Sequence, residues 1–372
     1  MKDFILLQIL PSLNSGGVEQ GTIDLATSLK NHGHNSFVAS NGGRMVPFLE
    51  KNKIKHFKIP LHSKNPLVMF MNIWRLKKII KRNGINIIHV RSRAPAWTAL
   101  FCKSKNIKLI STFHNIYGHS NIFKKKYNEG LAKSDKIIAI SKYVKNSITK
   151  IYKISSKKIV VVQRGIDLNY FKSENILEED VIEFMKKHLI PLDRKIILFP
   201  GRYSEWKGQL TFLEVISNLN DKKLFFLFVG DDKNQNYLKK IKNKINLYSL
   251  GSDCRLLGMQ ENMPLIYKLA SVIVSAPTKP EGFGRIVTEA MAMKKLIVAY
   301  NYGGVEEQIV NLPEICKVKP NDQSELIKKI IQATSISNAK YENIVNESYE
   351  FAIKHFDKKK MISKTLSFYR SL

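Results

Sequence analysis

The chain has 372 residues, 44% of them hydrophobic, and its 61 Lys and Arg against 31 Asp and Glu give a formal net charge of +30. This length and apolar content predict two domains with buried cores. Three widely separated cysteines without metal-ligand or CxxC spacing indicate reduced thiols in a cytosolic protein, and the sequence has no apolar run of 18 residues that would span a membrane.

The positive charge is concentrated between residues 51 and 150. This stretch holds 23 Lys and Arg but only two acids, Glu129 and Asp135, which is a net charge of +21. One interpretation is an anionic partner: nucleic acid, a membrane surface, phosphorylated sugars or nucleotides. The other is compositional, because Lys, Asn and Ile are abundant along the whole chain.

Short apolar runs alternate with longer amphipathic segments in the first half of the chain. The run "FILLQIL" at 4–10 is interpreted as a buried first strand rather than a signal peptide, because it is short and lacks a small-residue cleavage site. A helix is predicted from about Val18 to Lys30. Further strands are predicted at 35–40, 85–90, 107–113, 136–141 and 158–162, with helices between them, for example at 67–82 and 141–151.

A second series of strands follows an acidic, helical segment at 173–190. Its strands are predicted at 195–201, 224–230, 254–258, 270–276, 295–300 and 315–320. The alternation predicts an α/β fold of two doubly wound, Rossmann-like domains, each a parallel sheet covered on both faces. We expect ligands at the carboxyl ends of the strands, in a cleft between the facing domains.

The domain boundaries follow from this pattern. Residues 1–172 are expected to form the N-terminal domain and residues 191–355 the C-terminal domain. The segment 173–190 is expected to be a linking hinge helix. Residues 356–372 are expected to form a C-terminal helix that packs back on the N-terminal domain.

Two loops after predicted strands have residues suited to phosphate. In "LNSGGVEQG", Gly16 and Gly17 allow close backbone approach at the start of a helix, although a plain tight turn explains them equally well. In "PGRYSEWKGQ", Arg202 and Lys207 stand five apart on a turn. They form either a diphosphate clamp or two solvated surface charges, and the position at a strand end favours the clamp.

The stretch "KPEGFGRIVTEAMA" is predicted to be a loop followed by a helix. Glu281 lies in the loop and Glu289 lies in the helix, while the amides of Phe283, Gly284 and Arg285 come at the helix start. Buried carboxylates are costly unless they accept hydrogen bonds. Two acids flanking exposed amides therefore favour a polyhydroxylated ligand.

Two further positions lie at strand ends of the first domain. His114 follows the strand at 107–113, where a packed polar residue and a catalyst are equally good interpretations. Arg164 and Gly165 follow the last strand of that domain, and their simplest role is a turn.

Taken together, these motifs resemble those of retaining glycosyltransferases of family GT4 (glycosyl transferases group 1), which have the GT-B fold. "EGFGRIVTEAMA" is similar to the family's E-x7-E region, "GRYSEWKG" to its "GRL…KG" turn, and "SGGVE" to its N-terminal glycine loop. "YGGVEEQI" is similar to its late GG-x-x-E element, and "SDKIIAIS" and "RGID" fit in order. The resemblance covers nearly the whole chain. "VRSRAPAWTA" further resembles a bacterial subgroup that builds lipopolysaccharide core or related surface glycans, many of them mannosyl- or glucosyltransferases.

The resemblance implies a nucleotide-diphospho-sugar donor with no further cofactor, and a role for each matched residue. Arg202 and Lys207 would neutralise the donor diphosphate, and Glu289 would bind the ribose. Glu281, with the amides of Phe283, Gly284 and Arg285, would hold the sugar. Gly16 and Gly17 would close over it, His114 would contact it near the reacting carbon, and Gly258 would border the base. The implied catalytic residues are Glu281, His114, Arg202 and Lys207. One departure is Arg164-Gly165, where the family commonly has Asn-Gly.

The implied reaction transfers a hexose with retention of anomeric configuration. No second acid is evident beside the sugar, so same-face attack is favoured over covalent double displacement. No DxD motif stands at a strand end, and "GDDK" at 230–233 is interpreted as a loop turn, so no metal is expected.

The basic first domain is expected to hold a lipid-linked or phosphorylated glycan acceptor, and no nucleic acid. The basic segments 64–83 and 123–127 suggest peripheral association with the inner face of the cytoplasmic membrane by an otherwise cytoplasmic protein. The alternative for the apolar face at 67–80 is packing on the sheet. Rival functions are a non-catalytic anionic-ligand or nucleic-acid binding protein, and a nucleotide-sugar epimerase of the same fold.

Overall fold

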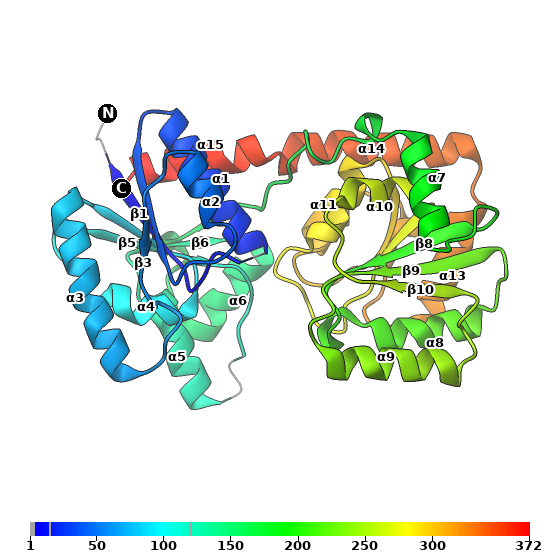
Figure 1. Cartoon of the computed structure of the whole chain (residues 1–372), viewed down its shortest axis with the longest axis horizontal. Helices are drawn as coiled ribbons and strands as arrows, with labels where there is room; N and C mark the ends of the chain where they lie inside the picture. Colours follow the sequence, from blue (N-terminus) through cyan, green and yellow to red (C-terminus); the bar gives the residue numbers. More distant parts are fainter. Residues whose placement is uncertain (1–3, 15, 119–120) are drawn as a thin grey trace. The chain divides into compact units, whose positions relative to one another are not determined.

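The computed structural model describes residues 4–14, 16–118 and 121–372 (Figure 1). The chain forms two compact units, the first running to Gln163 and including Lys359–Leu372, and the second spanning Arg164–Lys358. Each unit has its own parallel sheet. The predicted α/β fold with two doubly wound domains is therefore confirmed.

The described part of the first unit contains a seven-stranded parallel sheet in the order β3-β2-β1-β4-β5-β6-β7. Its strands are β1 (Ile5–Ile9), β2 (Asn35–Ser40), β3 (His56–Lys58), β4 (Ile87–Val90), β5 (Lys108–Phe113), β6 (Lys136–Ala139) and β7 (Ile159–Val161). The α-helices up to Gln163 are α1 (Gly17–Asn31), α2 (Val46–Lys51), α3 (Pro66–Asn83), α4 (Arg93–Leu100), α5 (Ile122–Ala132) and α6 (Lys142–Tyr152), and the 3-10 turn η1 is Ser156–Lys158. Strand β3 has no counterpart in the sequence analysis, because its three residues include His56 and Lys58 and form no apolar run.

The second unit contains a six-stranded parallel sheet in the order β10-β9-β8-β11-β12-β13. Its strands are β8 (Lys195–Pro200), β9 (Leu224–Val229), β10 (Cys254–Leu257), β11 (Val272–Ser275), β12 (Leu296–Tyr300) and β13 (Lys317–Val318). Its α-helices are α7 (Glu178–Lys187), α8 (Gln209–Leu219), α9 (Gln235–Leu247), α10 (Met263–Leu269), α11 (Arg285–Ala292), α12 (Glu306–Ile309), α13 (Gln323–Ser335) and α14 (Asn338–Phe356). The 3-10 turns are η2 (Ser173–Asn175), η3 (Glu205–Lys207) and η4 (Glu314–Cys316).

The strands of the second unit are largely apolar because helices cover both faces of the sheet (Figure 1). All six residues of β9, "LFFLFV", are buried. The Phe199 ring of β8 stacks on Phe212 of α8 with centroids 4.4 Å apart. This packing holds the start of α8 against the end of β8, where the loop with Arg202 and Lys207 lies.

The unit boundary differs from the one expected. The division falls after Gln163 rather than at 172, and the segment 173–190 belongs to the second unit. Within that segment, Glu178 of α7 forms an ion pair with Lys268 of α10 at 2.9 Å. Where the chain passes between the units, Ile166 pairs with Asp357 in an isolated parallel bridge. A Cβ on Gly165 would lie 2.5 Å from the Lys358 Cα, so only glycine fits there.

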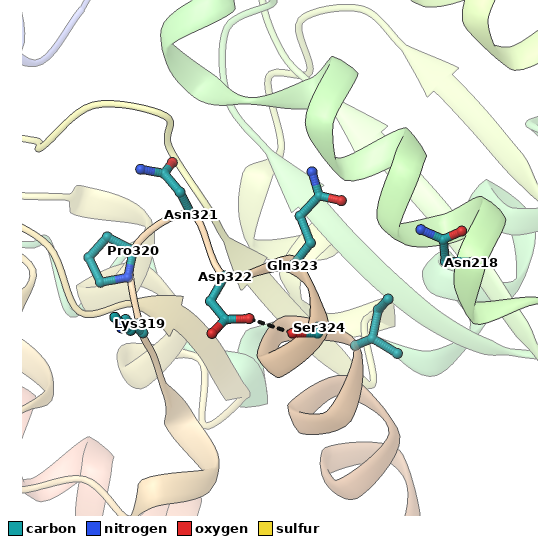
Figure 2. A pocket seen from close by; sticks show the side chains of 8 residues that line it. Asn218, Lys319, Pro320, Asn321, Asp322, Gln323 and Ser324 are labelled. Atoms are coloured by element: carbon teal, nitrogen blue, oxygen red, sulfur yellow. Dashed lines mark hydrogen bonds between the residues drawn. The ribbon is translucent and has the colours of Figure 1, made fainter.

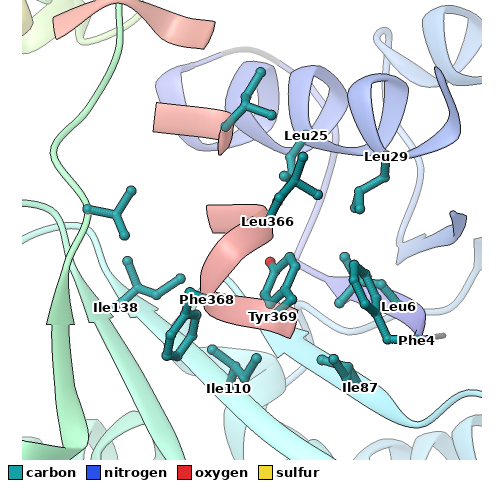
Figure 3. Packing of buried hydrophobic residues seen from close by; sticks show 12 residues of the cluster. Phe4, Leu6, Leu25, Leu29, Ile87, Ile110, Ile138, Leu366, Phe368 and Tyr369 are labelled. Atoms are coloured by element: carbon teal, nitrogen blue, oxygen red, sulfur yellow. The ribbon is translucent and has the colours of Figure 1, made fainter. Parts of the chain in front are cut away.

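The C-terminal helix α15 (Lys358–Arg370) joins the first unit from Lys359 onward. Figure 3 shows Leu366 and Tyr369 of this helix near residues of α1 and β1, and Phe368 near Ile110 of β5 and Ile138 of β6. The Tyr369 hydroxyl lies 2.5 Å from Nδ1 of the buried His89. Among the described residues, no helix has the length and apolar character needed to cross a membrane.

Candidate functional site

Three neighbouring strands of the second unit are each followed directly by a glycine: β8 by Gly201, β9 by Gly230 and β10 by Gly258. A Cβ on Gly230 would lie 2.1 Å from the Gly201 carbonyl oxygen, so the two strand ends touch through their backbones. A Cβ on Gly258 would lie 3.3 Å from Oδ2 of Asp232. This edge of the sheet therefore presents backbone rather than bulky side chains, which suits a flat or anionic ligand.

Lys207 and Glu281 meet beside this edge. The Lys207 Nζ lies 2.5 Å from Oε1 of Glu281, and their side chains are 24% and 12% exposed. The stem of Lys207 lies along Gly201, whose added Cβ would be 3.3 Å from the lysine Cδ. The Glu281 carbonyl accepts a hydrogen bond of 2.8 Å from the Gly304 amide. The fold thus brings together two residues that are 74 positions apart in sequence.

Arg202 is anchored through its backbone, while its side chain is exposed. The buried Gln209 donates from Nε2 to the carbonyls of Gly201, at 3.2 Å, and of Arg202, at 3.1 Å. The Arg202 guanidinium forms no ion pair with another described residue, so it is available to an anion at the mouth of this loop. Arg202 and Lys207 therefore differ: one cation is exposed and the other is held by a carboxylate.

Gly284 is the N-cap of helix α11 and has a φ of +80°. A Cβ there would lie 2.5 Å from Cγ2 of Val305. No side chain caps this helix, so the positive end of its dipole and the first-turn amides face the same loop as Glu281. The Phe283 side chain is buried with its ring 5.6 Å from that of Phe356, and Gln308 Nε2 donates to the Phe283 carbonyl. Of the groups of Phe283, the backbone amide is therefore the one left to contact a ligand.

Glu289, in the second turn of α11, is held from two sides. Its Oε1 pairs with Arg285 at 3.0 Å, and its Oε2 accepts a hydrogen bond of 2.8 Å from the Tyr267 hydroxyl. Tyr267 lies on α10 and is fully buried. Burial, together with the charge of Glu289, raises the pKa of Tyr267 well above its usual value, so the phenol stays a donor. A carboxylate has about four lone-pair positions, and two remain for a ligand.

Tyr267 is the residue that the sequence analysis missed. Its signal in "ENMPLIYKLA" is a tyrosine on an otherwise apolar, buried face, where a hydroxyl needs a partner. The partner is 22 positions away, so the sequence alone did not identify it.

The remaining site residues of the sequence analysis lie in the first unit. Gly16 is the N-cap of α1 with a φ of 132°, and Gly17 is the first residue of that helix, whereas Ser15 lies outside the described residues. His114 directly follows β5 and is half-buried. Since β1 and β5 flank β4 in one parallel sheet, these residues share its carboxyl edge. They belong to the first unit, whereas Arg202, Lys207, Glu281 and Glu289 belong to the second.

A surface cavity of about 650 Å³ lies elsewhere in the second unit (Figure 2). It is lined by Asn218 and by the loop and helix start at 319–324, and holds none of the site residues named above. Its acid, Asp322, caps α13 by accepting from the amide of Glu325 at 2.9 Å and from the Ser324 hydroxyl at 2.7 Å. These bonds, the amide's first, hold the pKa of Asp322 below its usual value. The carboxylate is therefore structural. Within the described parts of the chain, no group of three or more His, Cys, Asp or Glu is arranged to hold a metal.

Comparison with known proteins finds a matching family for each half of the chain. Residues 15–170 match the family described as Glycosyltransferase Family 4, and residues 180–351 match Glycosyl transferases group 1. The crystal structure of a glycosyltransferase from Rickettsia africae is 36% identical, covers 100% of this chain and 99% of its own, and superposes with a TM-score of 0.91.

Two further proteins are similar over most of the chain. An uncharacterised glycosyltransferase of Methanocaldococcus jannaschii is 26% identical over 332 residues, 87% of this chain and 86% of its own. The structure of HepE from Anabaena in complex with UDP and glucose is 20% identical, covers 99% of this chain and 100% of its own, and has a TM-score of 0.84. The predicted GT-B fold is confirmed by these structures.

Proposed function

This chain belongs to the family 4 glycosyltransferases (glycosyl transferases group 1), and on that premise we propose that it transfers a hexose from a nucleotide-diphospho-sugar to a hydroxyl of an envelope glycan, with retained configuration. The enzyme is a glycosyltransferase with the GT-B fold and uses a nucleotide-sugar donor. The acceptor we propose is a lipid-linked or phosphorylated glycan of the lipopolysaccharide-core type, supported by the "VRSRAPAWTA" motif and the basic first unit.

The observation that carries the proposal is the Lys207–Glu281 pair beside the uncapped start of α11. A lysine ammonium has three N–H donors, so Lys207 can keep Glu281 while another N–H binds a phosphate oxygen. Arg202 is exposed and free to bind the same diphosphate. The first-turn amides of α11 add the positive end of a helix dipole. Glu281 then accepts hydrogen bonds from the sugar, and Glu289 from the ribose diol.

In the proposed reaction, the bond between the anomeric carbon and the diphosphate oxygen breaks while the acceptor oxygen bonds to that carbon from the same face. The acceptor hydroxyl proton passes to the departing phosphate oxygen, and a nucleoside diphosphate leaves. Arg202 and Lys207 stabilise the negative charge that grows on the diphosphate. Fixed cations act strongly here because they need no reorganisation during the step. His114 is proposed to contact the sugar, and Gly16 and Gly17 to approach it through their backbone.

The test has two stages. A thermal-shift screen of the purified chain against UDP-, GDP- and ADP-sugars identifies the donor, because a ligand at about 100 times its Kd stabilises the fold by about 2.7 kcal/mol. Transfer to deacylated lipopolysaccharide-core oligosaccharide is then measured by nucleoside diphosphate release. Release only when the acceptor is present supports transfer. Conversion of the donor to its epimer without acceptor indicates an epimerase, and a chain that binds nucleotide without turnover indicates a binding protein.

Lys207→Ala is expected to lower turnover by about 10²–10³-fold, because removal of one electrostatic stabiliser costs about 2.7–4 kcal/mol of barrier. The matched control is Lys240→Ala, since Lys240 is also paired with a glutamate, Glu205 at 3.3 Å, but its side chain is 61% exposed. Both variants should unfold at temperatures close to that of the wild type. Near-normal turnover by Lys207→Ala would contradict the assignment of the diphosphate to this loop.

A further inference from the structure

Helix α3 of the first unit has two apolar faces. One face carries the buried Asn72, Leu76 and Ile80. The other carries four large side chains at the helical spacing i, i+3, i+4 and i+7, and all four point to solvent: Leu67 (75% exposed), Phe70 (73%), Met71 (46%) and Trp74 (64%). Packing within the first unit therefore accounts for the first face only. The alternative interpretation of the apolar residues at 67–80 fails for the second face.

The start of α5, in the same unit, carries two further exposed apolar side chains. Its first two residues, Ile122 and Phe123, are 81% and 83% exposed. The segment that leads into α3 contacts α5, because the Nζ of Lys64 lies 5.6 Å from the centroid of the Tyr127 ring. Monomeric soluble proteins rarely gather so many large apolar side chains in one exposed region.

Cations accompany these apolar residues. The Nζ of Lys78 lies 5.1 Å from the centroid of the Trp74 ring, Lys124 follows Phe123 directly, and Lys126 is two residues further on. We define the basic apolar face as these residues together: Leu67, Phe70, Met71, Trp74, Lys77, Lys78, Lys81, Ile122, Phe123, Lys124 and Lys126. A tryptophan in an apolar stripe flanked by lysines is the composition of a surface that lies at the boundary between lipid headgroups and acyl chains.

We propose that the basic apolar face docks the enzyme on an anionic lipid bilayer, with its apolar side chains inserted at headgroup depth. The possible partners of this face are a second copy of the chain, a nucleic acid and an anionic membrane, and charge distinguishes the first from the last. Residues 51–150 carry a net charge of +21, so a second copy of this chain would bring like charges together, whereas an anionic leaflet is complementary. Exposed Leu, Met and Ile side chains gain nothing from nucleic-acid phosphates, but they gain from acyl chains. The proposal rests on the proposed function in one respect: a lipid-linked acceptor would give the enzyme a reason to dock on a membrane.

The experiment is flotation of the full chain with vesicles of phosphatidylcholine, alone or mixed with phosphatidylglycerol, at low and high salt. Binding is expected only to the mixed vesicles, and high salt should weaken but not abolish it, because inserted apolar groups are not screened. Phe70→Ser and Trp74→Ser should each lower the partition coefficient by about tenfold, since each removes an inserted aromatic group. Both residues are exposed, so the variants should fold normally.

Leu247→Ser is the matched control. Leu247 is 75% exposed at the end of α9, a helix that also carries Lys239, Lys240, Lys242 and Lys244, but it stands outside the basic apolar face. Its partition coefficient should equal that of the wild type. Equal loss in control and test variants, or no binding of the wild type to mixed vesicles, would overturn the proposal. A wild-type dimer in gel filtration that Phe70→Ser dissociates would also overturn it, because the face would then bind protein.

Donor binding separates this inference from the proposed function. The thermal shift produced by the nucleotide-sugar should be the same in wild type and Phe70→Ser. Normal flotation of a chain that binds no nucleotide-sugar would refute the transferase proposal alone. Normal donor binding by a chain that does not float would refute the docking surface alone.

Discussion

The hydrogen bond from Tyr267 to Glu289 gives a sharp test of how the site holds its donor. Replacing Tyr267 by Phe removes one hydroxyl from a fully buried ring and changes little else in the packing. The lost bond is 2.8 Å long and ends on a carboxylate whose side chain is only 13% exposed. Hydrogen bonds to charged groups contribute about 1.5–3 kcal/mol. Glu289 would keep its contact with Arg285 but lose the donor that fixes its second oxygen.

If Glu289 accepts both ribose hydroxyls, a loosely held carboxylate should discriminate less between ribose and deoxyribose. Titration calorimetry would compare the nucleoside diphosphate with its 2′-deoxy analogue in wild type and Tyr267→Phe. The wild type should prefer the ribonucleotide, and the variant should lose about tenfold or more of that preference. The affinity for the deoxy analogue should change little, which a general loss of folding would not produce.

Tyr203→Phe is the control for the loss of a buried tyrosine hydroxyl that does not contact Glu289. The Tyr203 hydroxyl is equally buried, but its partners are main-chain carbonyls: the Leu257 oxygen at 2.5 Å, to which it donates, and the Phe228 oxygen at 3.1 Å. Its loss should lower stability and leave the ribose preference intact. An unchanged ribose preference in Tyr267→Phe would refute the positioning role of Tyr267 and would place the ribose away from Glu289.

Three further variants test the fold of the two units. Gly284→Ala should destabilise the second unit by about 1–3 kcal/mol in urea unfolding and weaken donor binding, because Gly284 has a φ of +80° and no room beside Val305. Leu366→Ala should cost about 2–5 kcal/mol in the same assay, since this buried leucine joins α15 to the core of the first unit. In Asp253→Asn, the free energy of unfolding should fall less steeply than in the wild type as the pH is lowered. Burial acts to raise the pKa of Asp253, but hydrogen bonds from Lys222 and Arg194 outweigh it and lower the pKa. Asp253 therefore stabilises the fold fully above its unfolded pKa and progressively less as pH falls through the lower folded value.

Each of these variants has a simple control. Gly251→Ala adds a methyl group where no atom lies within 4 Å, so its stability should match the wild type. Leu247→Ala removes an exposed side chain and should cost far less than Leu366→Ala. If the stability of Asp253→Asn still falls steeply with pH, other carboxylates control the loss of stability below about pH 4. Equal stability of Gly284→Ala and the wild type would show that Val305 moves aside.

Much of the fold could be predicted because its signals are local. In a parallel sheet covered on both faces, most strand positions are buried and apolar, so runs such as "LFFLFV" predicted β9 within one residue of its observed end. The candidate site could be predicted in part, because loops that follow such strands gather at one edge of the sheet. Arg202, Lys207, Glu281 and Glu289 were named from that rule and from family motifs. The short edge strand β3 was missed because three half-polar residues carry no periodic signal.

The sequence by itself determined the strand and helix alternation, the family and the residues that can bear charge at the strand ends. Only the tertiary structure decided which of those residues meet: Lys207 with Glu281, and Tyr267 with Glu289. It also decided which apolar face of α3 is covered and which is exposed. The physical reason is range. Hydrophobic periodicity acts between neighbours a few residues apart, whereas an ion pair or an exposed face depends on which distant segments the packed sheet brings together.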